Sequence, residues 1–135
     1  MKKIIALAFA LVVFQGMTQM GQVWPLATRQ EFEYDKDFKI TKEYESTSYC
    51  SFIMFINNNE FIHATDNITS LYKILSRTTD GTFNTYRVAS EVGNIYTFSF
   101  DATKKDIMIF SDKGYGIYYK TLTMYETKVF NNLSK

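Results

Sequence analysis

The sequence predicts an all-β fold, a small antiparallel meander of about seven or eight strands closed into a barrel. Aromatic residues make up 17% of the chain, including 12 Phe and 10 Tyr, and such residues favour pleated, half-buried surfaces. Apolar and polar residues alternate in several short runs, which is the period of a half-buried strand. Turn signals separate these runs about every 8 to 13 residues, a spacing typical of antiparallel barrels and sandwiches.

The first 21 residues predict a signal peptide. Lys2 and Lys3 precede an unbroken apolar run, Ile4–Phe14. This run fits a signal-peptide core of about 7 to 15 residues and is too short for a membrane span of about 20. Cleavage is expected between residues 16 and 22, which makes the protein secreted or periplasmic. The alternative is an uncleaved N-terminal membrane anchor.

Residues 22–135 are predicted to form a single antiparallel β domain. The segment 22–31 lacks sustained periodicity and is expected to be a lead-in with at most one short helical turn. Residues 38–45 alternate as a half-solvated strand does, and residues 32–34 are the expected partner across the turn at 35–37.

The middle of the chain predicts a hairpin and one ambiguous element. Residues 49–56 are apolar at almost every position, as in a strand covered on both faces or one deep in the sheet, and Asn57–Asn59 predict a tight turn into a strand at 60–65. Residues 68–78 fit a strand and also a short helix. Their Ser and Thr content and the Asp80-Gly81 turn signal favour the strand.

The last third predicts consecutive antiparallel strands. A strand over residues 82–89 is followed by three more, at 95–100, 107–110 and 115–120. Closure into a barrel removes the two free edges of such a meander. A two-sheet sandwich is the alternative.

Charge and cysteine content exclude several classes of function. Signal removal takes away two of 15 basic residues and none of 14 acidic ones, which leaves a net charge of −1. Nucleic-acid binding and membrane insertion after signal removal are therefore not expected. Cys50 is the single cysteine, so no intramolecular disulfide forms, and its apolar neighbours predict that it is buried.

Candidate chemical sites do not assemble from the sequence. His63 is the single histidine, and with Asp66 it provides too few ligands for a metal. In the expected hairpin, Cys50 and His63 lie about 10 Å apart, too far for a nucleophilic pair. The sequence therefore predicts no metal, no cofactor and no catalytic residue.

Carboxylates and tyrosines remain as candidates. Glu43 and Glu45 share a strand face but have the pattern of a solvated surface. The Gly114–Gly116 segment is read as a turn, not as a phosphate-binding loop. Tyr118 is expected to face the side of its strand opposite to Tyr115 and Tyr119, and exposed tyrosines provide a large contact area.

These observations favour an exported, non-catalytic binding or interaction module for a protein, glycan or apolar ligand. Its ligand-binding residues are unknown at this stage. Two alternatives are kept. One is a secreted hydrolase that uses Glu43, Glu45 or Asp66, and the other is a structural subunit of an envelope or surface assembly.

Overall fold

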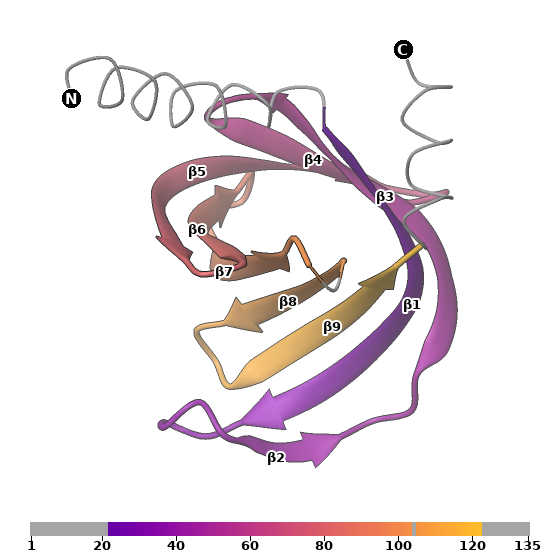
Figure 1. Ribbon diagram of the computed structural model, residues 1–135, viewed down its shortest axis with the longest axis vertical. Helices are drawn as coiled ribbons and strands as arrows, with labels where there is room; N and C mark the ends of the chain where they lie inside the picture. The colour runs from indigo at the N-terminus through magenta and orange to yellow at the C-terminus, as the bar shows by residue number, and fades with distance from the viewer. Residues whose placement is uncertain (1–21, 104, 123–135) are drawn as a thin grey trace, which may run out of the picture.

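The computed structural model describes residues 22–103 and 105–122, which form nine β-strands (Figure 1). In chain order they are β1 (Val23–Tyr34), β2 (Ile40–Glu43), β3 (Thr47–Asn57), β4 (Glu60–Ala64), β5 (Thr69–Asp80), β6 (Phe83–Ser90), β7 (Ile95–Asp101), β8 (Asp106–Ser111) and β9 (Tyr115–Thr121). The described part of the chain contains no helix that could span a membrane.

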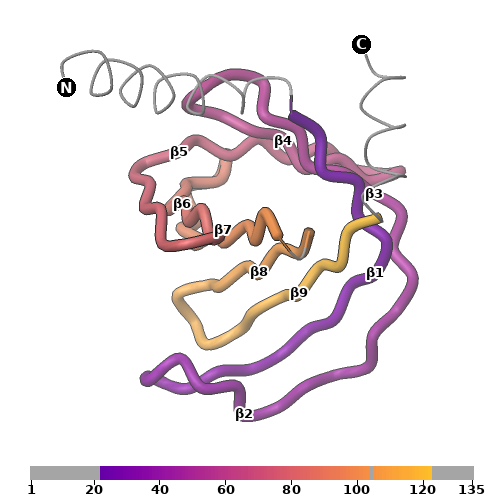
Figure 2. Tube along the Cα trace, in the orientation of Figure 1, coloured from indigo at the N-terminus to yellow at the C-terminus, as the bar shows by residue number. Residues whose placement is uncertain are grey.

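The strands form a closed antiparallel barrel, as the sequence predicts. Each strand from β3 to β8 pairs with the next, and β1 pairs with both β3 and β9. Figure 2 shows β9 lying beside β1 along this seam. Eight strands close the barrel, and β2 is an additional strand paired with the end of β1. The alternative of a two-sheet sandwich is therefore wrong, and the ambiguous segment 68–78 belongs to strand β5.

The expected lead-in over residues 22–31 is wrong, because this segment is most of the long strand β1. Pro25 obscures the strand signal, since proline usually interrupts sheet hydrogen bonding. In an antiparallel strand the N–H and C=O groups of one residue face the same neighbour. The Pro25 carbonyl accepts a hydrogen bond from Leu122, just past the end of β9. The proline nitrogen therefore faces the end of that strand, where no ladder donor is lost.

A β-bulge in β1 changes which residues face the barrel interior. The register with both neighbouring strands shifts between Leu26 and Thr28. Before the bulge, Trp24 and Leu26 belong to the core cluster. After it, the inward positions are odd-numbered, and they begin with Arg29, which interacts with the buried Tyr119. Such bulges re-aim side chains, and this one brings charged residues into the interior.

Strand β3 lies inside the sheet, between β1 and β4, and only its inner face is buried; the alternative of a strand covered on both faces is wrong. Ser51, Ile53 and Phe55 are buried, whereas the residues between them are partly or fully exposed. Cys50 is on the outer face and is exposed, so the prediction of a buried thiol is wrong. No second layer covers this face in the described residues, because the fold is a barrel closed around one interior.

The hydrophobic core fills one half of the barrel. We call this half the packed end; its turns are Asn58–Asn59, Gly81–Thr82 and 102–105. The largest fully buried side chains are aromatic and interlock edge to face or tilted, with Phe61 and Phe98 centroids 5.0 Å apart and Trp24 and Phe100 centroids 5.2 Å apart. The opposite half, with loops 44–46, 65–68, 91–94 and 112–114, is the open end.

Candidate ligand-binding site

A cavity of about 380 Å³ opens on the inner side of the barrel at the open end. Strands β1, β7, β8 and β9 provide most of its wall, and the loop after β2 adds one residue. Ile109 belongs to the core cluster, and Ile117 and Tyr96 pack against it, so the cavity begins where the core ends. The lining residues are Glu31, Phe32, Tyr44, Tyr96, Ile109, Ser111, Tyr115, Gly116 and Ile117.

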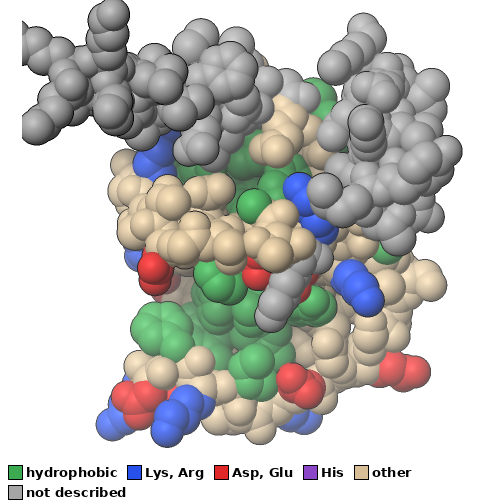
Figure 3. Space-filling view, in the orientation of Figure 1, with side chains coloured by type: hydrophobic (Ala, Val, Ile, Leu, Met, Phe, Trp, Pro, Cys, Tyr) green, Lys and Arg blue, Asp and Glu red, His purple; other side chains and the backbone are tan. Residues whose placement is uncertain are grey.

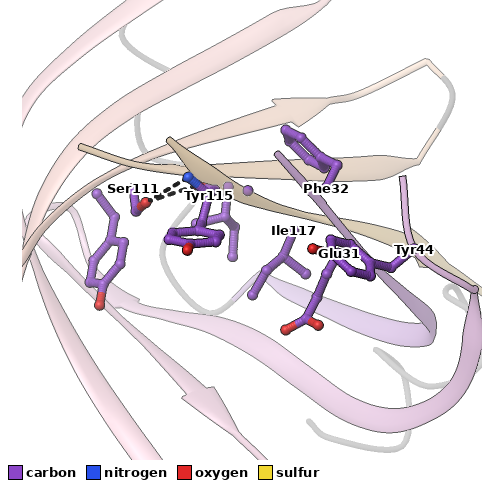
Figure 4. Close-up of a pocket in the computed structure, with 9 residues that line it drawn as sticks. Glu31, Phe32, Tyr44, Ser111, Tyr115 and Ile117 are labelled. Atoms are coloured by element: carbon purple, nitrogen blue, oxygen red, sulfur yellow. Dashed lines mark hydrogen bonds between the residues drawn. The ribbon is translucent and has the colours of Figure 1, made fainter. Parts of the chain in front are cut away.

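The register of the β1–β9 pairing determines which polar and apolar side chains line the wall of the cavity. Glu31 pairs with Ile117, and the two side chains lie on the same side of the β1–β9 seam, with Tyr115 nearby (Figure 4). Phe32 points to the opposite side of the sheet in the same view. The Ser111 hydroxyl donates to the Tyr115 carbonyl over 2.9 Å and fixes the strand end. Glu31 and the tyrosines thus present polar atoms from an otherwise apolar wall.

Behind the cavity lies a group that we call the interior polar cluster: Arg29, Glu31, Tyr49, His63 and Tyr119. Arg29 Nη2 donates to Glu31 Oε1 over 2.9 Å, and Arg29 also interacts with the Tyr119 hydroxyl. The Tyr49 and Tyr119 rings stack with centroids 5.3 Å apart. The cluster is therefore continuous from the cavity wall, through Glu31, into the barrel interior.

His63 is held in this cluster as a neutral side chain. Its Nε2 atom lies 3.2 Å from Ser51 Oγ and 3.4 Å from the Tyr49 hydroxyl. Burial, reinforced by the nearby Arg29 charge, lowers the pKa of His63 to about 4. The imidazole therefore forms these hydrogen bonds in its neutral form at neutral pH.

Burial also affects the pKa values of Arg29 and Tyr119, two other members of the interior polar cluster. Burial opposes the charge of the Arg29 guanidinium, but its hydrogen bonds with Glu31 and Tyr119 prevail and raise the Arg29 pKa. Burial, together with the nearby Tyr49, raises the pKa of the Tyr119 phenol. Arg29 therefore stays charged and Tyr119 stays protonated at neutral pH.

The structure separates the residues that sequence reasoning considered as chemical partners. Cys50 is on the outer face of β3, whereas His63 faces the interior and pairs in register with Ile53. The two residues are three positions apart along the sheet, as the sequence predicts, and they also lie on opposite faces. Asp66 lies in the β4–β5 turn, beside Cys50 in a broad outer hollow of about 710 Å³.

Glu43 and Glu45 are both exposed and do not line the inner cavity. Glu43 lies in a separate outer hollow of about 250 Å³ beside Met108 and Tyr118.

Hydrophobic side chains gather in a hollow over β8 and β9 on the face seen in Figure 3. Among the described residues, no group of three or more His, Cys, Asp or Glu side chains could hold a metal ion.

The three tyrosines of β9 lie on the two faces of the strand as the sequence predicts. Tyr119 is buried in the interior, and Tyr115 stands at the open rim with 60% of its surface exposed. Tyr118 is on the outer side, where its hydroxyl donates to Asp106 over 2.8 Å. Burial, with the adjacent Asp106 carboxylate, raises the Tyr118 pKa to about 12.

Sequence reasoning missed Arg29 and Glu31, the charged residues of the site. Their spacing of two places both on one face only if the segment is a strand. The lack of sustained periodicity over residues 22–31 indicates an irregular lead-in and hides this signal.

Comparisons of the chain with models of known protein families, with curated proteins and with solved structures find no match. The fold and the cavity therefore provide the basis for a functional proposal.

Proposed function

We propose that this chain is an exported, non-catalytic binding protein that holds a small molecule at the open end of its barrel. The observation that carries the proposal is the inner cavity of about 380 Å³, which borders the hydrophobic core cluster. Small-molecule sites commonly measure about 300 to 1,000 Å³ and combine apolar walls with a few polar groups. Eight-stranded barrels are wide enough to hold one small ligand in this way.

The electrostatics of the cluster favour binding over catalysis. A general base works best with a pKa near the working pH, and the His63 pKa of about 4 is well below neutrality. The Tyr119 phenol is shifted in the direction that keeps its proton. These groups are suited to fixed hydrogen bonds and not to proton transfer at neutral pH.

A cavity-filling variant tests the proposal. A panel of small apolar and amphipathic compounds is titrated by calorimetry against the purified wild-type protein and against Ile117→Trp. Because Ile117 lines the cavity, the indole is expected to occupy the ligand space and abolish binding. Met108→Trp on the outer face of the neighbouring strand is the matched control and should bind as the wild type does.

Loss of binding in both variants, or in neither, would contradict a site inside the barrel.

The hydrolase and structural-subunit hypotheses stay predictions. Glu43 and Glu45 lie at the end of β2 and in the loop after it, Asp66 lies in the β4–β5 turn, and none of them lines the inner cavity. The proposed export is tested by fractionating cells that express the full chain or residues 22–135. Only the full chain is expected outside the cytoplasm, with a mass reduced by its first 15 to 22 residues.

A further inference from the structure

The charge at the cavity wall is already balanced by the protein. Glu31 is the one charged residue among the described lining residues, and its carboxylate accepts the Arg29 hydrogen bond at 2.9 Å. The side chains of Arg29 and Glu31 are 32% and 54% exposed, so the pair lies at the boundary between the interior and water. The neutral His63 and the protonated Tyr119 add no net charge to the interior polar cluster.

This balance disfavours a charged ligand. An anion would compete with Glu31 for Arg29, and a cation would compete with Arg29 for Glu31. Either ligand leaves one charge of the pair without its partner, and the cost is modest because both side chains are partly exposed to water. An uncharged ligand leaves the pair intact.

Glu31 nevertheless keeps unused hydrogen-bonding capacity. An ionised carboxylate offers about four lone-pair positions and donates nothing. The bond from Arg29 uses Oε1. The remaining positions accept from a donor that enters the cavity, and a hydroxyl is the simplest uncharged donor.

The rest of the wall fits an apolar body. Ile109 and Ile117 form an aliphatic surface, and Tyr96 and Tyr115 contribute aromatic rings from two different strands. Rings of this kind pack against flat or aromatic ligands and keep their hydroxyl groups toward water. The polar contact is therefore at one side of a predominantly apolar space.

We propose that the ligand is an uncharged, predominantly apolar molecule whose hydroxyl group donates a hydrogen bond to the Glu31 carboxylate. This inference rests on the proposed function and names the ligand class of the same cavity. Arg29 acts as a positioning residue, since it holds the Glu31 carboxylate and balances its charge.

Three matched probes test the ligand class: 2-(1-naphthyl)ethanol, 1-naphthaleneacetic acid and 2-(1-naphthyl)ethylamine. They share one aromatic body and differ in a neutral, negative or positive end at pH 7. Calorimetric titration of the wild type should give the alcohol about two- to fivefold tighter binding than either charged probe, because the partly exposed pair contributes only modestly. Ile117→Trp should abolish the binding of all three.

The variant Glu31→Gln sharpens the test. It removes the negative charge, leaves Arg29 uncompensated and should make the acid bind at least as tightly as the alcohol. Glu45→Gln makes the same change at an exposed residue that does not line the cavity, and it should keep the wild-type preference.

Two results would overturn the inference in different ways. If the acid or the amine binds the wild type most tightly and Ile117→Trp abolishes that binding, the cavity site stands and the ligand class is wrong. If none of the probes binds, both this inference and the small-molecule function are contradicted.

Discussion

The two halves of the barrel differ in how completely their interior is filled. At the packed end, Phe61 and Phe98 are 0% and 1% exposed and lie within an interlocked aromatic cluster. At the open end, the inward side chains of Tyr96 and Ile117 are half-buried and border the cavity. One continuous set of strands therefore builds a solid core and a hollow site along the same barrel.

This difference separates stability from binding. Buried aromatic side chains contribute large hydrophobic free energies, because almost all their surface is removed from water. Side chains around the cavity have lost less surface and have fewer partners to lose. We therefore expect substitutions at the packed end to change the free energy of unfolding and those at the open end to change ligand affinity.

The largest expected contrast lies within strand β7. Phe98→Ala removes a ring that contacts Phe61 and Tyr72, and should lower the free energy of unfolding by about 3 to 5 kcal/mol. Tyr96→Ala, two residues away on the same face, should cost only about 1 kcal/mol. Urea denaturation of both variants measures the contrast. Equal losses would contradict the division of the barrel into two halves.

Acid should destabilise the protein through His63. In the unfolded chain His63 has a pKa near 6.5, and in the fold it is about 4, so the unfolded state binds the proton more readily. The stabilising contribution is complete above pH 6.5 and is lost as the pH falls to about 4. It amounts to at most about 3 kcal/mol.

The variant His63→Gln isolates this contribution, because it retains a polar side chain that does not titrate. The loss of unfolding free energy between pH 7 and pH 4 should be smaller in the variant than in the wild type. The comparison between the two proteins cancels the effect of the carboxylates. Parallel curves would show that His63 is not buried in its neutral form.

A smaller effect is expected at the β1–β9 seam. A Cβ atom at Gly116 would overlap the Phe32 ring, which covers this glycine on the outer face of the barrel. Gly116→Ala should cost about 1 to 3 kcal/mol, since the ring must shift within the cluster that it forms with Phe110. The double variant Gly116→Ala with Phe32→Leu should recover part of the loss. An unchanged midpoint in thermal unfolding of Gly116→Ala would contradict the close packing of this seam.

Much of the fold is predictable from the sequence because most strands alternate regularly and end at clear turns. The hairpins at Asn58–Asn59 and Gly81–Thr82 follow directly from their Asn and Gly signals. Strand β1 is the exception, since Pro25 and the bulge between Leu26 and Thr28 break its period. The prediction that Cys50 is buried is wrong, because an apolar run does not reveal whether the outer face of the strand is covered.

The cavity itself was beyond sequence reasoning. Glu31, Tyr96 and Ile117 belong to three strands that are far apart in the chain, and only the barrel register brings them to one wall. Arg29 and Glu31 also depend on the bulge, which turns odd-numbered residues inward. The register leaves no pattern in the alternation of a single sequence, and a bulge interrupts the alternation without showing which residue is the extra one.

The open end of the barrel is a hollow that the fold does not need to fill. The free energy of unfolding of Ile117→Trp, measured by chemical denaturation without ligand, tests this directly. We expect a value within about 0.5 kcal/mol of the wild type or up to about 2 kcal/mol higher, because the indole enters empty space. A loss of about 2 kcal/mol or more would mean that this space is already filled by the protein in solution, and it would contradict a ligand site there.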